Sequence, residues 1–193
     1  MKTLLITGFD PFGGATVNPS WLAVQALPDV IGDFSVHKMQ IPTVFGEAAE
    51  IVGKKAAEIG ADVILCVGQA GGREAVTPER IAVNIRDARI ADNAGNQPRG
   101  EFVDADGSAA YFATVPVEKM AQAIRDVGIL SVVSNSAGAF VCNDVLYTLL
   151  RRFDGTKTRV GFIHVPYLPE QGSPSMELEK IIQALTAAIS VCL

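Results

Sequence analysis

Short apolar runs alternate with segments of helical periodicity along the chain. The run in Asp62–Val67 is apolar on consecutive positions, which is typical of a strand buried on both faces of a sheet. Thr43–Ile59 instead repeats its apolar side chains near helical spacing. Strands that alternate with helices favour a parallel sheet between two helical layers. The expected fold is therefore α/β: a single-domain, three-layer α/β/α sandwich around a largely parallel (mixed), twisted sheet.

The same patterns assign the other elements. Strands are expected at Lys2–Thr7, Phe34–Ile41, Asp62–Val67, Glu79–Ile85, Leu130–Ser134 and Arg159–Val165, and helices at 18–27, Thr43–Ile59, Val117–Val127, Cys142–Phe153 and 174–193. Asn18 should cap the first helix, with Pro19 at its first position. Asp87–Ala113 shows no sustained period, so we expect a long loop that could include a hairpin.

Size and composition exclude several classes of protein. A chain of 193 residues suits one domain, 1–193. No apolar stretch approaches the roughly 18–20 residues of a membrane span, and the N-terminal apolar run is too short for a secretory signal. A net charge of −5 without a basic cluster argues against a nucleic-acid partner. Three cysteines without C-x-x-C spacing and two histidines predict free thiols, a reducing cytoplasm and no metal.

Unusual residue clusters follow predicted strands. Ligands of such folds gather beyond the carboxyl ends of the strands, so these segments are the candidate site. They are Gly8–Gly14, Gly68–Arg73, Ser134–Asn143 and Gly161–Pro166. None is a Walker loop or a G-x-G-x-x-G dinucleotide motif, so a nucleotide cofactor is weakly supported.

Cys142 is the candidate nucleophile. It precedes the helical pattern of Val145–Leu150, and the positive end of a helix dipole favours the thiolate. A buried, inert cysteine is the alternative from this residue alone. Cys66, inside an apolar run, is expected to be a core residue, and Cys192, at the end of the sequence, to be incidental.

His164 ends an apolar strand and is the candidate base, although a lone histidine there could also be a core residue. A cysteine and a histidine at the carboxyl ends of one sheet would project into the same crevice, as a thiol and its general base must. His37 lies within an amphipathic strand and is expected to face solvent.

Glu79 is the candidate acceptor that orients the base. The alternative is a surface partner for Arg73 or Arg80. Ser136 is a rival nucleophile, but its surroundings lack the G-x-S-x-G elbow of α/β hydrolases.

Together these segments resemble the pyroglutamyl peptidase I (pyrrolidone-carboxylate peptidase) family of cysteine peptidases. Thr7–Gly13 with Asn18–Ser20 is similar to its N-terminal motif, and Gly68–Arg73 leading to Glu79–Arg80 to its glutamate motif. Its cysteine and histidine motifs are matched by 136–143 and 161–171. Order, spacing and total length agree, so the resemblance covers essentially the whole chain.

The resemblance implies a thiol protease (a hydrolase) that removes N-terminal pyroglutamate from peptides through a thioester, with Cys142, His164 and Glu79 as its triad. It further implies no metal or organic cofactor, a cytoplasmic location and a homotetramer. The positions that match its substrate-binding residues are Phe9, Phe12 and Phe140 around the pyroglutamyl ring, Gln69, whose backbone would read the lactam, and Arg89 near the reacting carbonyl.

Three residues depart from the family pattern. Asp144 stands where a histidine is common, Ala139 replaces a usual threonine, and Pro78 directly precedes Glu79. Asp144 could oppose thiolate formation if it pointed at the sulfur. On a helix that Cys142 begins, however, Asp144 should face away, favour the dipole and stabilise the fold slightly.

Two other functions compete with the peptidase. A purine nucleoside phosphorylase-like enzyme has a related sheet and could hold phosphate in its glycine-rich loops. A catalytically silent binding protein on the same scaffold is the second alternative, which Asp144 keeps open.

Overall fold

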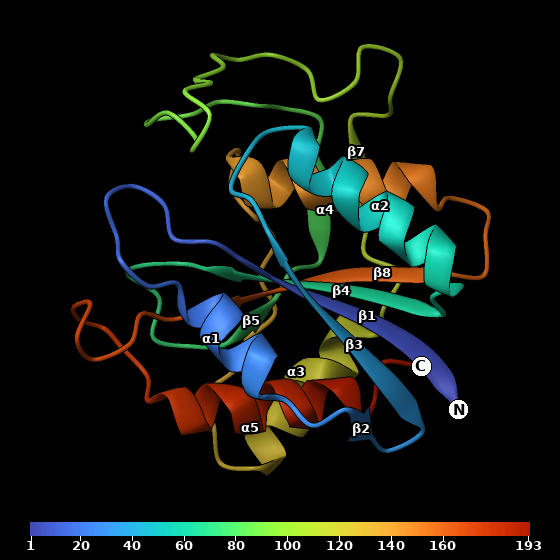
Figure 1. Ribbon diagram of the computed structural model, residues 1–193, viewed down its shortest axis with the longest axis vertical. Helices are drawn as coiled ribbons and strands as arrows, with labels where there is room; N and C mark the ends of the chain where they lie inside the picture. Colours follow the sequence, from blue (N-terminus) through green and yellow to red (C-terminus); the bar gives the residue numbers. More distant parts are fainter.

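Six strands form a central sheet in the order β2-β3-β1-β4-β8-β5 in the computed structural model, which describes residues 1–193. Helices α1, α3 and α5 pack on one face of this sheet, and α2 and α4 cover the other (Figure 1). The three-layer α/β/α fold expected from the sequence is thereby confirmed.

The strands and helices have the following bounds. The strands are β1 (Lys2–Phe9), β2 (Val30–Ile31), β3 (Phe34–Ile41), β4 (Val63–Gln69), β5 (Thr77–Pro78), β6 (Ile81–Val83), β7 (Ala110–Phe112) and β8 (Arg159–Val165). The helices are α1 (Pro19–Ala26), α2 (Glu47–Ile59), α3 (Val117–Asp126), α4 (Val141–Arg152) and α5 (Leu178–Ile189).

The four central strands are parallel, so their carboxyl ends lie along one edge of the sheet. β1 pairs with β3 and β4, and β4 pairs with β8, with Gly68 opposite His164. The outer strands β2 and β5 run antiparallel to their neighbours, which makes the sheet mixed. This edge carries the ends of β1, β4 and β8, and it is where the candidate site was predicted.

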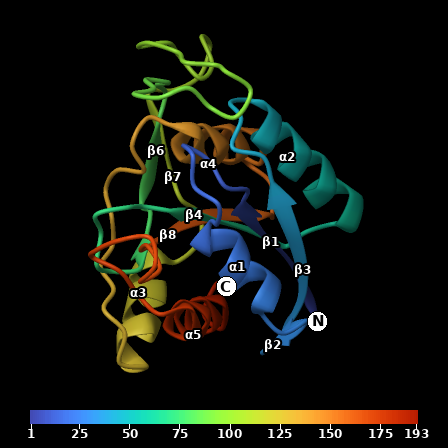
Figure 2. The same ribbon diagram turned by 60° about the vertical axis from the view of Figure 1, so that its left-hand side comes forward.

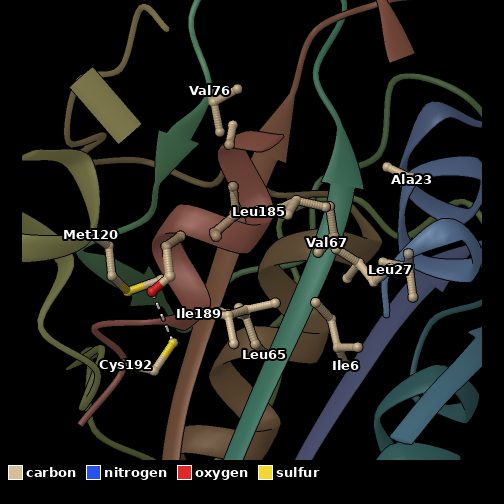
Figure 3. Packing of buried hydrophobic residues seen from close by; sticks show 14 of the residues in the cluster. Ile6, Ala23, Leu27, Leu65, Val67, Val76, Met120, Leu185, Ile189 and Cys192 are labelled. Carbon is tan, nitrogen blue, oxygen red and sulfur yellow. Dashed lines mark hydrogen bonds between the residues drawn. The ribbon is translucent and has the colours of Figure 1, made fainter. Parts of the chain in front are cut away.

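Apolar side chains of β1, β4 and β8 pack on the helices of both layers. One cluster joins residues such as Ile6, Leu65 and Val67 to α1, α3 and α5 (Figure 3). Cys192 belongs to this cluster: it is fully buried and its thiol donates to the Ala188 carbonyl (3.4 Å). Cys192 is therefore a core residue like Cys66, because the turn after α5 folds the thiol back onto the core.

The second cluster lies under α2 and α4. It contains Cys66, which is buried as expected. The first turn of α1 has the predicted cap: the Asn18 side chain accepts from the Ser20 N–H (3.1 Å), with proline at the start of the helix.

Several expected elements differ from the structure. Leu130–Ser134 is not a strand but forms two isolated bridges, Ser131 to Val76 and Ser134 to Glu79. The strand expected over Glu79–Ile85 is β6, only Ile81–Val83, and the final helix begins at Leu178 rather than at 174. Most of the long loop lacks regular structure, and it lies beyond α2 and α4 at one end of the molecule (Figures 1 and 2). Its last residues form β7, which completes a hairpin-like pair with β6.

None of the helices has the length and apolar character needed to cross a membrane.

Candidate active site

Cys142 lies in the first turn of α4, whose helix begins at Val141. Its thiol is partly buried and lies against β4 at Gly68. A Cβ built on Gly68 would lie 2.9 Å from the Cys142 sulfur and 2.8 Å from Cζ of Phe162. Only glycine therefore leaves room for the sulfur at this point of the strand.

His164 lies on the neighbouring strand, β8, directly opposite Gly68 in the register. Its ring packs on Phe162, with ring centroids 4.8 Å apart, and the residue is 3% exposed. The Cys142 sulfur and His164 thus both lie next to Gly68, as the sequence predicted, although only His164 comes from a strand and Cys142 comes from the start of a helix. His37, by contrast, is exposed on β3.

Glu79 orients the imidazole of His164. The Nδ1 of His164 lies 2.7 Å from Oε1 of Glu79, and both residues are buried. The short strand β5 produces this contact: Thr77 pairs with His164, and the Glu79 N–H donates to the Phe162 carbonyl (2.9 Å). Because β5 is an edge strand, Pro78 fits there without the N–H that it lacks.

Glu79 also contacts Arg73, one of its two alternative partners, but as a fully buried residue rather than at the surface. Besides His164, its Oε1 accepts from Nη1 of Arg73 (2.7 Å). Burial opposes ionisation, but the hydrogen bond and charge of His164, with a smaller contribution from Arg73, hold the pKa of Glu79 below its ordinary value. Glu79 is therefore an anion that accepts a hydrogen bond from Nδ1–H, which leaves Nε2 of His164 free to take a proton.

The thiol of Cys142 is subject to opposing electrostatic influences. Burial, followed by the negative charge of Glu79, raises its pKa to about 12. Arg73 and the backbone N–H of Cys142 act in the opposite direction but are outweighed. The helix N-terminus favours the thiolate as expected, through the backbone N–H of Cys142, but desolvation of the sulfur opposes it more strongly.

The aromatic residues matched by the resemblance fall into two groups. Phe12 and Phe140 are half-buried neighbours with ring centroids 6.0 Å apart, and Phe45 packs edge-on against Phe140 at 5.2 Å. Phe9 is instead 1% exposed and packs on Phe162 in the core.

A cleft of about 600 Å³ opens next to Phe12. It is lined by Gln69 at the end of β4 and by the exposed Arg89 from the long loop. The side chain of Gln171 donates to that of Gln69 (2.9 Å), which fixes the end of β4. The structure therefore brings Phe12, Gln69 and Arg89 to one opening.

Asp144 points away from the sulfur, as the helical spacing predicted. Its carboxylate is fully buried and accepts from Nε of Arg86 (2.6 Å) and from the backbone N–H of Gly46 (2.7 Å). Sequence reasoning missed Arg86, because no local pattern indicates that the loop after β6 returns to α4.

The remaining candidates lack the contacts of a reacting group. Ser136 is exposed, and its hydroxyl accepts from the Gly138 N–H (3.2 Å) in a turn. No cluster of three or more histidine, cysteine or acidic side chains could hold a metal ion.

Known proteins are similar to this chain in both sequence and fold. The family model described as "Pyroglutamyl peptidase" matches residues 1–193. The chain is 49% identical to the pyrrolidone-carboxylate peptidase of Staphylococcus saprophyticus, covering 96% of this chain and 91% of the relative. It is 51% identical to that of Levilactobacillus brevis, covering 96% and 95%.

Solved structures agree. Pyroglutamyl peptidase I of Bacillus amyloliquefaciens superposes with a TM-score of 0.96 at 44% identity, covering all of this chain and 97% of the other. Pyrrolidone carboxyl peptidase of Thermococcus litoralis gives a TM-score of 0.94 at 38% identity, covering 100% and 93%.

Proposed function

This chain belongs to the pyroglutamyl peptidase family, and from that premise we propose that Cys142, His164 and Glu79 are the triad of its reaction. The protein is a cysteine peptidase that removes N-terminal pyroglutamyl residues from peptides. The residue assignment rests on the 2.7 Å contact between Glu79 and His164. His164 pairs with Gly68 on the neighbouring strand, and the Cys142 sulfur packs against Gly68.

The nucleophilic step needs a general base. Since the pKa of the Cys142 thiol is raised to about 12, the thiol must lose its proton as it attacks the pyroglutamyl carbonyl carbon. Nε2 of His164 accepts that proton, while ionised Glu79 stabilises the resulting imidazolium. His164 then protonates the departing amine, the carbon–nitrogen bond breaks, and a thioester with Cys142 remains. Water hydrolyses the thioester and releases pyroglutamate.

The first turn of α4 can stabilise the oxyanion. Its N-terminal residue, Phe140, provides no side-chain cap, so backbone N–H groups of the first turn stay available. We propose that these N–H groups donate to the carbonyl oxygen of a substrate whose carbon lies at the sulfur. Arg89 at the cleft is proposed as a second contributor, on the strength of the family resemblance.

The aromatic pair suits the pyroglutamyl ring. The ring is flat and carries no ammonium group, so a pocket for it needs apolar faces and a few backbone partners rather than a carboxylate. We propose Phe12 and Phe140 as the faces that enclose the ring and the backbone of Gln69 as its polar partner. Phe9 would support this wall from the core.

We also propose that residues 1–193 form one peptidase domain that assembles as a homotetramer in a reducing cytoplasm. Three free thiols and exposed apolar side chains, among them Phe102 (70%) and Phe112 (67%), support this proposal. Light scattering on the purified protein tests the oligomeric state.

One assay separates this function from its alternatives. We expect release of a fluorogenic amine from its pyroglutamyl amide and none from the matching prolyl amide, which lacks the lactam carbonyl. Phosphate-dependent nucleoside cleavage would instead support a phosphorylase, which the family match already disfavours. No turnover of either substrate would indicate a silent binding protein.

A further inference from the structure

Arg73 and His164 donate to the same oxygen of Glu79. Nη1 of Arg73 and Nδ1 of His164 each lie 2.7 Å from Oε1. The guanidinium is thus part of the same hydrogen-bonded unit as the proposed base, although it reaches Glu79 from the loop after β4. Nothing in the reaction described above uses this cation.

The guanidinium of Arg73 is held in place by two further acceptors. Its Nη1 donates to Oγ1 of Thr77 (2.7 Å), and its Nη2 donates to the Ser136 carbonyl (3.0 Å). These acceptors belong to β5 and to the segment before α4, so the arginine is fixed relative to both the base and the nucleophile helix. An arginine held by several acceptors keeps its charge at a defined place.

Few other charges face the thiol. The titratable groups that influence Cys142 are Glu79, Cys66 and Arg73. Cys66 is uncharged, since burial raises its pKa to about 12. Glu74 lines the same cavity as Arg73 but forms no ion pair with it. Besides His164, the Arg73 cation is therefore the positive charge in contact with Glu79 at this site.

We propose that Arg73 is a positioning residue that sets the pH range of the reaction by partly neutralising Glu79. The proposal rests on the roles proposed above for Cys142, His164 and Glu79. Without the cation, Glu79 would bind the imidazolium more strongly and would oppose a thiolate more strongly. Both groups would then lose their protons at higher pH. The sign is the same whether the reacting pair is thiol with imidazole or thiolate with imidazolium.

The test compares pH profiles of Arg73→Gln and the unaltered protein. We expect both limbs of kcat/KM, and the pH dependence of alkylation of Cys142 by iodoacetamide, to move upward by about one unit in Arg73→Gln. Measurements at low ionic strength give the largest shift, because the arginine side chain is 32% exposed and salt screens its charge.

Arg80→Gln is the matched control. Arg80 is close in sequence and equally charged, but its side chain contacts Asn135 and Glu118 rather than Glu79. Its profile should coincide with that of the unaltered protein. An equal shift in Arg80→Gln would overturn the proposal, because net charge alone would then explain the effect.

Arg73→Lys keeps the test decisive if Arg73→Gln does not fold. Lysine retains the charge but cannot hold all three acceptors, so we expect a lower rate with a profile within about 0.3 units of the original. Two results would show that Arg73 only stabilises the structure. They are a lower rate without a shift of the pH profile in Arg73→Gln, or a full-unit shift of the pH profile in Arg73→Lys. Neither result would affect the proposed triad, which fails if Cys142→Ala stays active, or the peptidase function, which fails if the unaltered protein does not cleave the pyroglutamyl amide.

Discussion

Glu79 and Asp144 are two fully buried carboxylates, each paired with a partly exposed arginine. They differ in their second oxygen. Asp144 has both oxygens satisfied, one by Arg86 (2.6 Å) and one by the Gly46 N–H (2.7 Å). Glu79 directs two donors to Oε1, while Oε2 has no hydrogen-bond partner.

This difference separates a structural carboxylate from a functional one. The donors of Asp144 are an arginine and a backbone amide, so Asp144 joins α4 to the start of α2 and to the loop after β6. Glu79 instead holds a histidine, whose proton can move, and directs both of its closest donors to one oxygen. A buried, incompletely satisfied carboxylate next to an imidazole is typical of a site that performs chemistry.

The largest loss of activity should come from removing the Cys142 thiol, the nucleophile that the Glu79–His164 pair is proposed to serve. Cys142→Ala should lower pyroglutamyl-amide cleavage by more than about 10³-fold, since no other nucleophile is in place. Cys66→Ala and Cys192→Ala should keep most of the activity, although both remove buried sulfurs from the core. Alkylation by iodoacetamide, followed by peptide mapping, should find Cys142 modified fastest. Full activity in Cys142→Ala would falsify the mechanism.

Removal of the base comes next. His164→Ala should lower kcat by about 10²–10⁴-fold, because general-base catalysis is lost. The control is His37→Ala, which removes the other, exposed histidine and should leave kcat unchanged. If His37→Ala were the more damaging of the two, the assignment of the base would be wrong.

The two carboxylates can be compared directly by amide substitution. Glu79→Gln should lower kcat by about 10²-fold, less than His164→Ala, because Glu79 orients the base without transferring the proton. Asp144→Asn should leave kcat and the thiol titration nearly unchanged. A drop of a full pH unit in that titration would show that Asp144 faces the sulfur.

Asp144→Asn should instead lower the free energy of unfolding by about 2 kcal/mol, because Arg86 loses a buried partner. The helical spacing alone predicted only a slight loss of stability. The buried ion pair with Arg86 makes the expected loss larger. Urea unfolding measures this difference. Equal losses of stability and kcat in both variants would remove the distinction between the two carboxylates.

The smallest effect concerns acid stability. The pKa of Glu79 is lowered from 4.5 in the folded protein, so its ionised form contributes stability that is present above 4.5 and is lost as pH falls below it. Glu79→Gln lacks this contribution. The stabilities of the two proteins should therefore converge as the pH falls below 4.5 and through the lowered pKa of Glu79 in the folded protein. Curves that stay parallel throughout this range would show that folding leaves the ionisation of Glu79 unchanged.

The sequence alone determined the layered α/β fold, the strand that carries His164, the helix start that carries Cys142, and the exposure of His37. These follow from local periodicity and from the rule that parallel strands end at one edge. The sequence motifs around Cys142, His164 and Glu79 indicated the family, and the family implied the pyroglutamyl substrate. The direction in which Asp144 points also followed from helical spacing.

Only the tertiary structure decided which charges meet. The contact of Glu79 with both His164 and Arg73 depends on a two-residue edge strand, and the pairing of Arg86 with Asp144 joins residues 58 positions apart. The raised pKa of the Cys142 thiol and the burial of Cys192 likewise depend on what packs around each sulfur. Burial and electrostatic interactions act between residues that are close in space, and local sequence patterns carry no record of that proximity.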